Sequence, residues 1–509
     1  MVRFRNISVR VYLPVLSGLM SFISFAFLFL FVLVFASRLL LGRTKTEPAY
    51  LIFLLLASII FYGWHTPMYL LIILVSTVID YRAAIEIHNC GQRLDGESAA
   101  AEIIKLQRQR KQCLLVSLVA NLGMLAFFKY TDFALTEVSA GLSVSLPKLR
   151  LILPMGISFY TFQSMSYTID VYRGHIKPLD TFWKFFLYVS FFPQLVAGPI
   201  VRASEFLYQL DRRRQLHLKA FNQGGYLVLR GLFLKVVCAD NIGRYVDVHW
   251  QDAWGTNPNS SALLLASVLF AFQIFGDFAG YSSIARGLAY WLGFRFPKNF
   301  NSPYLATSFS NFWQRWHITL SEWLRDYLYV PLGGNRCGPI RTYVNLMFVM
   351  VLGGLWHGAS LTFVVWGILH GVALAIERRL GVNRMTSTSP AIARFAWFVT
   401  VQAVVLLTWI VFRSQTLEEA GLVLSGIFAV NFAALKFDAV LPVLCALPIV
   451  AAHLRGFMAE RGAAVPGRRW VLNRLHDIHP FEQAIVAAVM LVGILTCYAQ
   501  SSDFMYFQF

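Results

Sequence analysis

The chain has few charged residues. Of its 509 residues only 14% are Asp, Glu, Lys or Arg, whereas 57% are hydrophobic and the mean hydropathy is +0.58. This balance is the reverse of that in a soluble domain. The apolar runs do not alternate with polar residues, which argues against a membrane β-barrel. We therefore predict an all-α, polytopic membrane protein of roughly 11 to 13 transmembrane or re-entrant helices, because each crossing takes about 20 apolar residues.

The common motifs of soluble enzymes are also absent. No GxSxG, Walker A or HExxH motif occurs, nor a GxGxxG in a strand–helix context, which argues against the usual hydrolase, nucleotide and zinc-protease chemistries. The cysteines contain no CxxC pair and no metal-ligand spacing, so the sequence predicts neither a disulfide framework nor a metal site. The six cysteines are Cys90, Cys113, Cys238, Cys337, Cys445 and Cys497.

The net charge of +18 does not point to nucleic acid, because the basic residues lie in short stretches between apolar runs. Under the positive-inside rule these stretches are candidates for cytoplasmic loops. The lipid bilayer is the expected partner, and no nucleic acid is expected. The stretches are Arg93, Lys105–Lys111, Arg212–Arg214, Arg378–Arg379 and Arg455–Arg474.

The apolar runs divide the chain into candidate spans. Val11–Ser37 carries no charge and is too long for a signal-peptide core, so it is expected to be a retained first span. Met20 is a possible alternative start, which would make residues 1–19 an extension. No repeat or Pro- or Ser-rich linker divides the chain, so residues 1–509 are interpreted as one membrane domain, with a core at about 150–376 and C-terminal helices at 393–500. The later spans are expected at 51–62, 69–79, 114–128, 151–167, 185–201, 225–237, 261–275, 395–412, 422–434, 439–452 and 484–498.

The run Tyr343–Ile376 contains no Asp, Glu, Lys or Arg. As a single helix it would extend about 50 Å, which overshoots one bilayer. We therefore expect a turn inside it, at Gly353–Gly354 or at Gly358–Ser360, where glycine permits the chain to bend. His357 lies between these two points.

An ionisable group in such a run is expected to face the bundle interior or a water-filled cavity. His357, among Leu355, Trp356 and Phe363, is therefore a candidate catalytic residue, although a lone buried histidine is more often a hydrogen-bonded core residue. His370 has similar surroundings and is the weaker candidate, because its glycine neighbours suggest close helix packing.

Residues 311–331 predict one amphipathic helix. Asn311 and Gln314 resemble a capping box, and Pro331 marks the expected end. Trp313, Trp316 and His317 share one face with Leu320 and Leu324, whereas Arg315, Glu322, Arg325 and Asp326 make the remainder polar. We expect this helix to lie at the membrane interface or in a polar cavity.

Polar residues also interrupt two other apolar runs. Ser158, Gln163 and Ser164 could line a polar channel, or their hydroxyls could bond to the preceding helical turn. Asp277 could orient a histidine or cap a helix. These patterns alone do not separate an enzyme from a transporter.

Several blocks of the chain resemble the membrane-bound O-acyltransferase (MBOAT) family, and within it the bacterial branch of the alginate O-acetylases. The blocks follow one another in the family's order and spacing over most of the chain. They are Leu153–Tyr160, Ile169–Gly174, Phe192–Pro199, Asp277–Ser282, Gly293–Phe296, Phe312–His317, Trp323–Tyr329, Leu332–Arg336 and Gly353–Gly358.

The resemblance implies a ring of helices around a central funnel and two histidines associated with activity, which match His317 and His357. On this interpretation His357 is the base, and His317 orients the acceptor or donates a hydrogen bond to the developing charge, although the two roles could be exchanged. The channel residues implied with them are Trp313, Trp316, Trp356, Asp277, Ser158, Gln163 and Arg325. Three positions depart from the alginate pattern, which leaves the acceptor open: Gln163, Ser283 and Gln314.

The implied reaction is O-acetylation of an exported polysaccharide such as alginate, in the inner membrane of a bacterium. The donor is a cytosolic thioester, with acetyl-CoA as substrate and no bound cofactor, and the acceptor is the polysaccharide or a periplasmic SGNH-type acetyltransferase. The resemblance also allows cellulose or peptidoglycan as the polymer, or D-alanylation of teichoic acid. Two alternatives without chemistry are a transporter of an acyl donor or polymer and a scaffold for a secretion complex.

Overall fold

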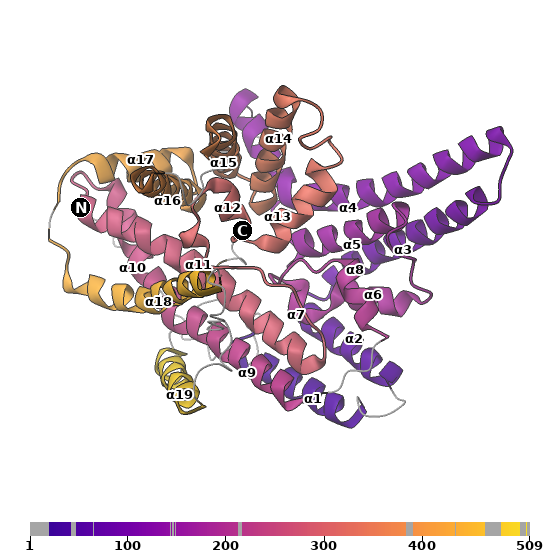
Figure 1. The fold of residues 1–509 in the computed structure, drawn as a ribbon, viewed down its shortest axis with the longest axis horizontal. Helices are drawn as coiled ribbons and strands as arrows, with labels where there is room; N and C mark the ends of the chain where they lie inside the picture. The colour runs from indigo at the N-terminus through magenta and orange to yellow at the C-terminus, as the bar shows by residue number, and fades with distance from the viewer. Residues whose placement is uncertain are drawn as a thin grey trace.

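The computed structural model describes residues 20–41, 47–64, 66–142, 144, 147, 149–211, 216–382, 390–432, 434–463, 480–498 and 505. Within these ranges the regular elements are helices without strands, so the predicted all-α fold is confirmed (Figure 1). The possible extension at residues 1–19 lies outside the described residues. The helices are α1 (Phe25–Leu41), α2 (Glu47–Gly63), α3 (Tyr69–Leu94), α4 (Ala100–Leu142), α5 (Ile157–Tyr172), α6 (Phe182–Ser190), α7 (Phe192–Leu195), α8 (Ala203–Phe206), α9 (Leu218–Leu232), α10 (Asp240–Trp250), α11 (Ser260–Leu292), α12 (Phe309–Trp313), α13 (Ile318–Leu324), α14 (Pro339–His357), α15 (Leu361–Leu380), α16 (Ala391–Arg413), α17 (Leu417–Phe428), α18 (Val440–Ala463) and α19 (Pro480–Cys497), with π-helical segments η2 (Phe233–Ala239) and η5 (Arg325–Tyr329).

Six helices of the described part are long and apolar enough to cross a bilayer: α4, α11, α14, α15, α16 and α18. Three shorter apolar helices, α1, α2 and α19, accompany them. The chain is thus a multi-pass membrane protein. Some expected spans are broken rather than continuous. The run at 185–201 forms α6 and α7 and then continues without helix, and its residues are buried, where irregular backbone is tolerated.

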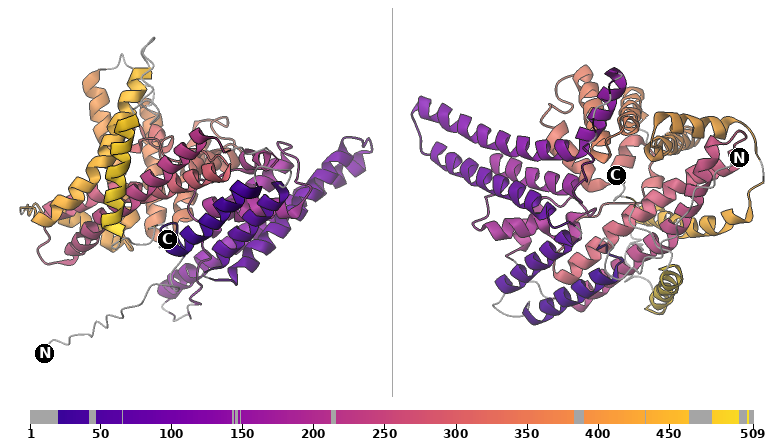
Figure 2. Two further views of the ribbon diagram at one scale, coloured as in Figure 1. Left: turned by 90° about the horizontal axis from the view of Figure 1, so that it is seen from below. Right: turned by 180° about the vertical axis from the view of Figure 1, so that it is seen from behind.

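Helices α3 and α4 lie side by side and project from the rest of the bundle (Figure 2). A buried polar cluster joins them. The Asp80 carboxylate accepts hydrogen bonds from Ser117 Oγ at 2.6 Å and from Asn121 Nδ2 at 2.8 Å, and Ser76 Oγ donates to Asn121 Oδ1 at 2.9 Å. Because lipid offers no hydrophobic force between helices, such bonds help to specify their pairing.

Helix α11 runs through the middle of the bundle, with α9 packed along it (Figure 1). Glycines allow the two backbones to approach closely. A Cβ at Gly231 would lie 2.6 Å from Gly280 O, and one at Gly287 would lie 2.6 Å from Gly224 O. This small-residue packing fixes the position of α11, and with it Asp277 in the middle of the helix.

The expected turn inside 343–376 is confirmed. Helix α14 ends at His357, residues 358–360 turn, and Ser360 caps α15 by accepting from Thr362 N. Gly354, at the other expected turn, lies inside the helix. Glycine is needed there because a Cβ would lie 2.2 Å from Phe363 O. His357 is therefore the last helical residue beside a tight turn, and its backbone is held by two packed helices.

The prediction of one helix at 311–331 is wrong. Ser308, not Asn311, caps a short α12 through Asn311 N, and the chain then turns before α13. His317 sits in this turn with a left-handed backbone, φ 43° and ψ 53°, a conformation that a continuous helix cannot contain. The helical spacing of the tryptophans conceals this break.

Candidate active site

The two histidines pack against one indole ring. The Trp356 ring centroid is 5.9 Å from that of His317 and 5.0 Å from that of His357, and both imidazoles meet the indole nearly at right angles. Residues 40 positions apart in sequence thus share one aromatic enclosure. Its further members are Phe159 and Phe278 around His317, and Trp366 and Phe412 around His357.

His317 is fully buried, and its ring has a defined orientation. Its Nδ1 accepts a hydrogen bond from Leu320 N at 3.3 Å, so the ring caps α13. An acceptor nitrogen carries no proton, and in a neutral imidazole the proton must therefore be on Nε2. Within the described part of the chain Nε2 has no hydrogen-bond partner. His317 is thus oriented as a hydrogen-bond donor at Nε2.

The end of α14 beside His357 is held by a lysine and a tyrosine of α4. Lys129 Nζ of α4 donates to His357 O at 3.0 Å and also to Trp356 O, and Tyr130 OH donates to Leu355 O at 2.6 Å. These bonds satisfy carbonyls that the helix terminus leaves open. The backbone of His357 is therefore anchored from outside its own helix.

Two cavities meet beside His357. The smaller one, of about 10 Å³, has room for one water and is lined by His357, Trp316 and Trp409. The larger, of about 570 Å³, falls within the usual range of ligand sites. Asp277, Phe412 and Met505 line both cavities and so form the boundary between them. The other charged residues of the larger cavity are Lys235, Asp240, Arg244, Asp247, Arg413 and Glu419.

Asp277 lies in the middle of α11, so the hypothesis that it caps a helix is wrong. Its Oδ1 pairs with Lys235 Nζ at 2.7 Å, and Lys235 also pairs with Asp240 at 2.8 Å. Its Oδ2 accepts from Met505 N at 3.0 Å. The buried Asp277 carboxylate is thus neutralised by Lys235. It also holds Met505, which lies at the boundary between the two cavities.

The other predicted channel residues divide into two groups. Ser158 and Trp316 adjoin the site: Ser158 O accepts from Trp356 Nε1 at 3.3 Å, and Trp316 lines the smaller cavity. Trp313 packs one layer away against His370 and Trp366. The Gln163 amide is fully buried and has no hydrogen-bond partner in the described ranges. It therefore bonds to neither histidine.

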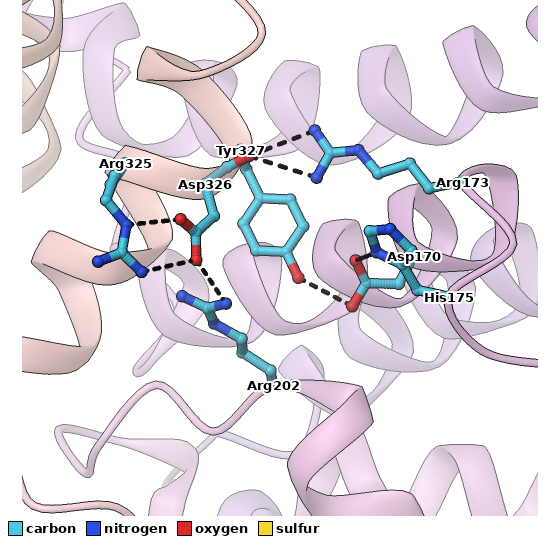
Figure 3. Close-up of polar contacts among 7 residues, drawn as sticks. All are labelled: Asp170, Arg173, His175, Arg202, Arg325, Asp326 and Tyr327. Carbon is cyan, nitrogen blue, oxygen red and sulfur yellow. Dashed lines mark hydrogen bonds and ion pairs between the residues drawn. The ribbon is translucent and has the colours of Figure 1, made fainter. Parts of the chain in front are cut away.

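Arg325 lies apart from both histidines. It is the first residue of η5, which directly continues α13, and it pairs with Asp326 at 2.6 Å (Figure 3). His370 is buried beside Trp366 at 4.7 Å and does not line either cavity. Across the described residues no group of three or more His, Cys, Asp or Glu is placed to hold a metal ion.

Sequence reasoning missed three residues of the site. Lys129 stands in a long apolar helix, and a lysine at membrane depth is a functional signal that was available in the sequence. Trp366 and Phe412 gave no such signal, because an aromatic residue in an apolar helix usually belongs to the packing. Only the tertiary structure places them against His357.

The fold and the site define a polytopic membrane protein with a paired-histidine centre enclosed by its helices. Residues 59–413 match the membrane-bound O-acyltransferase family, and the chain belongs to that family. It is therefore an acyltransferase. The matched range contains both histidines and extends beyond the core expected at about 150–376.

Named relatives act on different polymers. The chain is 37% identical to the probable alginate O-acetylase AlgI of Pseudomonas aeruginosa, over 81% of this chain and 75% of the relative. It is 36% identical to the peptidoglycan O-acetyltransferase of Helicobacter pylori, over 75% of this chain and 74% of the relative. A teichoic acid D-alanyltransferase of Streptococcus thermophilus is 30% identical over 44% of this chain and 56% of that protein.

Proposed function

We propose that the protein transfers an acetyl group from a cytosolic thioester to an acceptor of an exported cell-envelope polysaccharide, with His357 and His317 as the catalytic pair. The observation that carries the proposal is the placement of both histidines around Trp356, with one of them beside two adjoining cavities. The names of the relatives support acyl transfer to such polymers.

The tautomer of His317 favours one assignment of roles. A base needs an unprotonated nitrogen facing the substrate, and His317 uses its unprotonated nitrogen to cap α13. His317 therefore donates its Nε2–H to the oxyanion, and His357 acts as the base. The acceptor hydroxyl gives its proton to His357 while its oxygen attacks the thioester carbonyl carbon. The carbon–sulfur bond then breaks, and the departing thiolate takes the proton from His357.

The distribution of charge supports an orientation in the bacterial inner membrane. Arg110 donates to Tyr172 O at 2.9 Å, and Arg202 pairs with Asp326 at 2.8 Å, so basic residues of distant segments gather at the end where α5 finishes. Helix α15 runs antiparallel to α14 and brings Arg378 and Arg379 back toward the end where α14 begins. By the positive-inside rule this basic end faces the cytosol. The larger cavity then opens on the periplasmic side.

The identity of the acceptor polymer is the most detailed part of the proposal. Alginate is one candidate, and the similar identity to the peptidoglycan relative makes peptidoglycan another. The acceptor in the larger cavity is either a hydroxyl of the polysaccharide itself or a periplasmic acetyltransferase that passes the acetyl group on. Acetyl-CoA is the proposed donor and is consumed as a substrate.

Thioester turnover by the purified protein in lipid nanodiscs tests this function. Wild-type protein is expected to release free thiol from acetyl-CoA, and His357→Ala to lower kcat at least 100-fold, in the range of lost general-base catalysis. His370→Gln is the matched control, because it also removes a buried histidine beside Trp366 but one outside both cavities. It is expected to retain activity.

Two different results would contradict the proposed function. Undiminished turnover in His357→Ala at equal protein level removes His357 from the mechanism. A wild-type protein that carries a thioester or polymer across the membrane without cleaving the thioester would instead favour the transporter.

A further inference from the structure

A short segment after α11 bonds to the chain on both sides of His317. Asn301 N donates to Arg315 O at 2.9 Å. Ile318 N donates to Asn299 O, also at 2.9 Å. The segment therefore runs alongside the turn and holds it before and after His317. The left-handed backbone of this residue is sterically strained, and such strain persists only where the surrounding structure enforces it.

The side chain of Asn299 adds a second set of bonds to the same turn. Its Oδ1 accepts from Thr319 N at 3.3 Å and from Thr319 Oγ1 at 3.0 Å. Its Nδ2 donates to Ser282 Oγ at 3.3 Å. All three residues are buried, with exposed fractions of at most 3%. Because Ser282 belongs to α11, one amide joins this central helix to the first turn of α13.

Thr319 extends the network to a third segment. Its Oγ1 accepts from Ile200 N at 3.0 Å, while its hydroxyl proton goes to Asn299 Oδ1. The hydroxyl is thus used both as a donor and as an acceptor, and a valine of the same shape could do neither. A buried polar network whose members are bonded to one another favours a single arrangement of the segments that it joins. We call Asn299, Thr319 and Ser282 the Asn299 junction.

The Asn299 junction bonds to the elements that orient the His317 ring. Phe278 of α11 packs on that ring at 4.7 Å. The bond from Leu320 N to Nδ1 depends on the position of the first turn of α13, which Thr319 holds. A shift of this turn would therefore redirect the Nε2–H, which has no hydrogen-bond partner among the described residues.

We propose that Asn299 is a positioning residue for acyl transfer, which keeps the His317 turn in the conformation that directs the Nε2–H at the oxyanion. Asn299 lines neither cavity, so it is placed to act through His317 and not on the substrate. A displacement of about 1 Å in such a donor can cost on the order of 100-fold in rate. This inference rests on the proposed function, because it assumes that His317 stabilises the oxyanion.

Thioester turnover by variants in lipid nanodiscs tests the proposal in a double-mutant cycle. Asn299→Leu nearly keeps the volume of the side chain but removes its hydrogen bonds, and it is expected to lower kcat roughly 10- to 100-fold while KM changes much less. In the His317→Asn background, which lacks the Nε2–H, the same substitution should have little further effect, because no donor is left to misdirect. A residue that serves only the fold would lower kcat by the same factor in both backgrounds.

A matched pair of substitutions at Thr319 tests the same network without changing Asn299. Thr319→Val removes the hydroxyl and should reproduce the loss of kcat, whereas Thr319→Ser retains the hydroxyl and should keep most of the activity. Asn345→Leu is the control for a lost buried amide. Asn345 bonds to Leu332 O and Gly334 O in the loop before α14, so this variant is expected to lower the melting temperature but to leave kcat near the wild-type value.

The results separate this inference from the proposed function. A wild-type kcat in Asn299→Leu, or equal factors in the two backgrounds, overturns the role of Asn299 while turnover by the wild-type protein stands. A normal kcat in His317→Asn overturns it as well, because there is then no donor to position. Absence of turnover from the wild-type protein contradicts the proposed function itself. If Asn299→Leu does not fold, Thr319→Val and Thr319→Ser are compared in the same two backgrounds and decide in the same way.

Discussion

At the scale of single residues, the backbone of His317 explains its chemistry. A non-glycine residue with φ 43° is uncommon, and such strain persists where the surrounding structure enforces it. Here the ring bond to Leu320 N and the packing of Phe278 at 4.7 Å hold the residue in place. The same bond that caps α13 selects the tautomer, so folding and the direction of the Nε2–H are coupled.

His317→Asn separates these two roles. Asparagine tolerates the left-handed conformation and is a good N-cap, so α13 is expected to keep its cap and the protein its melting temperature within a few degrees. The shorter side chain cannot replace the Nε2–H, and kcat for thioester turnover should fall about 100-fold or more, as when an oxyanion donor is removed.

Kinetics and thermal unfolding of this variant in nanodiscs check the prediction. A normal kcat with a lowered melting temperature would show that His317 serves the fold alone. A KM that changes by much less than kcat is the signature of a group acting in the transition state.

At the scale of elements, the hairpin of α14 and α15 determines where His357 stands. Its helices touch through glycines: a Cβ at Gly367 would lie 2.5 Å from Met350 O, and one at Gly354 2.2 Å from Phe363 O. Such contacts involve backbone atoms, which cannot rotate away. The two helices therefore have to separate if either glycine acquires a side chain.

Gly354→Ala is expected to destabilise the protein by about 1–3 kcal/mol through overpacking and to lower activity by displacing His357. Gly123→Ala is the control, because Gly123 is also helical but a Cβ there meets no atom within 4 Å. It should be neutral or stabilising by up to about 1 kcal/mol, as for an exposed glycine in a helix. Equal effects of the two substitutions, measured by thermal unfolding, would contradict the proposed packing.

The same elements show what the sequence can predict. The turn after His357 follows from the length of the apolar run and from its glycines, both of which are local features. The break at His317 does not, because Trp313, Trp316 and Leu320 retain a helical spacing on either side of it. The ion pairs of Asp326 are also beyond the sequence: the pattern places Arg325 in the channel, whereas it pairs with Asp326, and Arg202, which pairs with the same carboxylate, is 123 positions from Arg325 in sequence.

At the scale of the whole molecule, two different ends surround one buried centre. The basic end carries Arg202 and Arg325, which both pair with Asp326. The opposite end carries the larger cavity, which is lined by charges of both signs, among them Asp240, Arg244 and Glu419. His357 lines the smaller cavity, which adjoins the larger one, while η5 continues α13 from His317 toward Asp326 at the basic end. Under the proposed function, only the acetyl group would need to pass between the histidines, because the donor and the acceptor would each approach from their own side.

Chemical labelling of Cys337 and of an introduced cysteine, with the other five native cysteines replaced by serine, tests this arrangement. Cys337 is exposed in the segment between η5 and α14, so it should react with a membrane-impermeant maleimide in inside-out vesicles but not in intact spheroplasts. Thr256 is exposed in the segment before α11, and Thr256→Cys in a Cys337→Ser background should give the opposite pattern. Labelling of both positions from the same side would contradict the two-sided arrangement, and reversal of both patterns would place the basic end outside the cytosol.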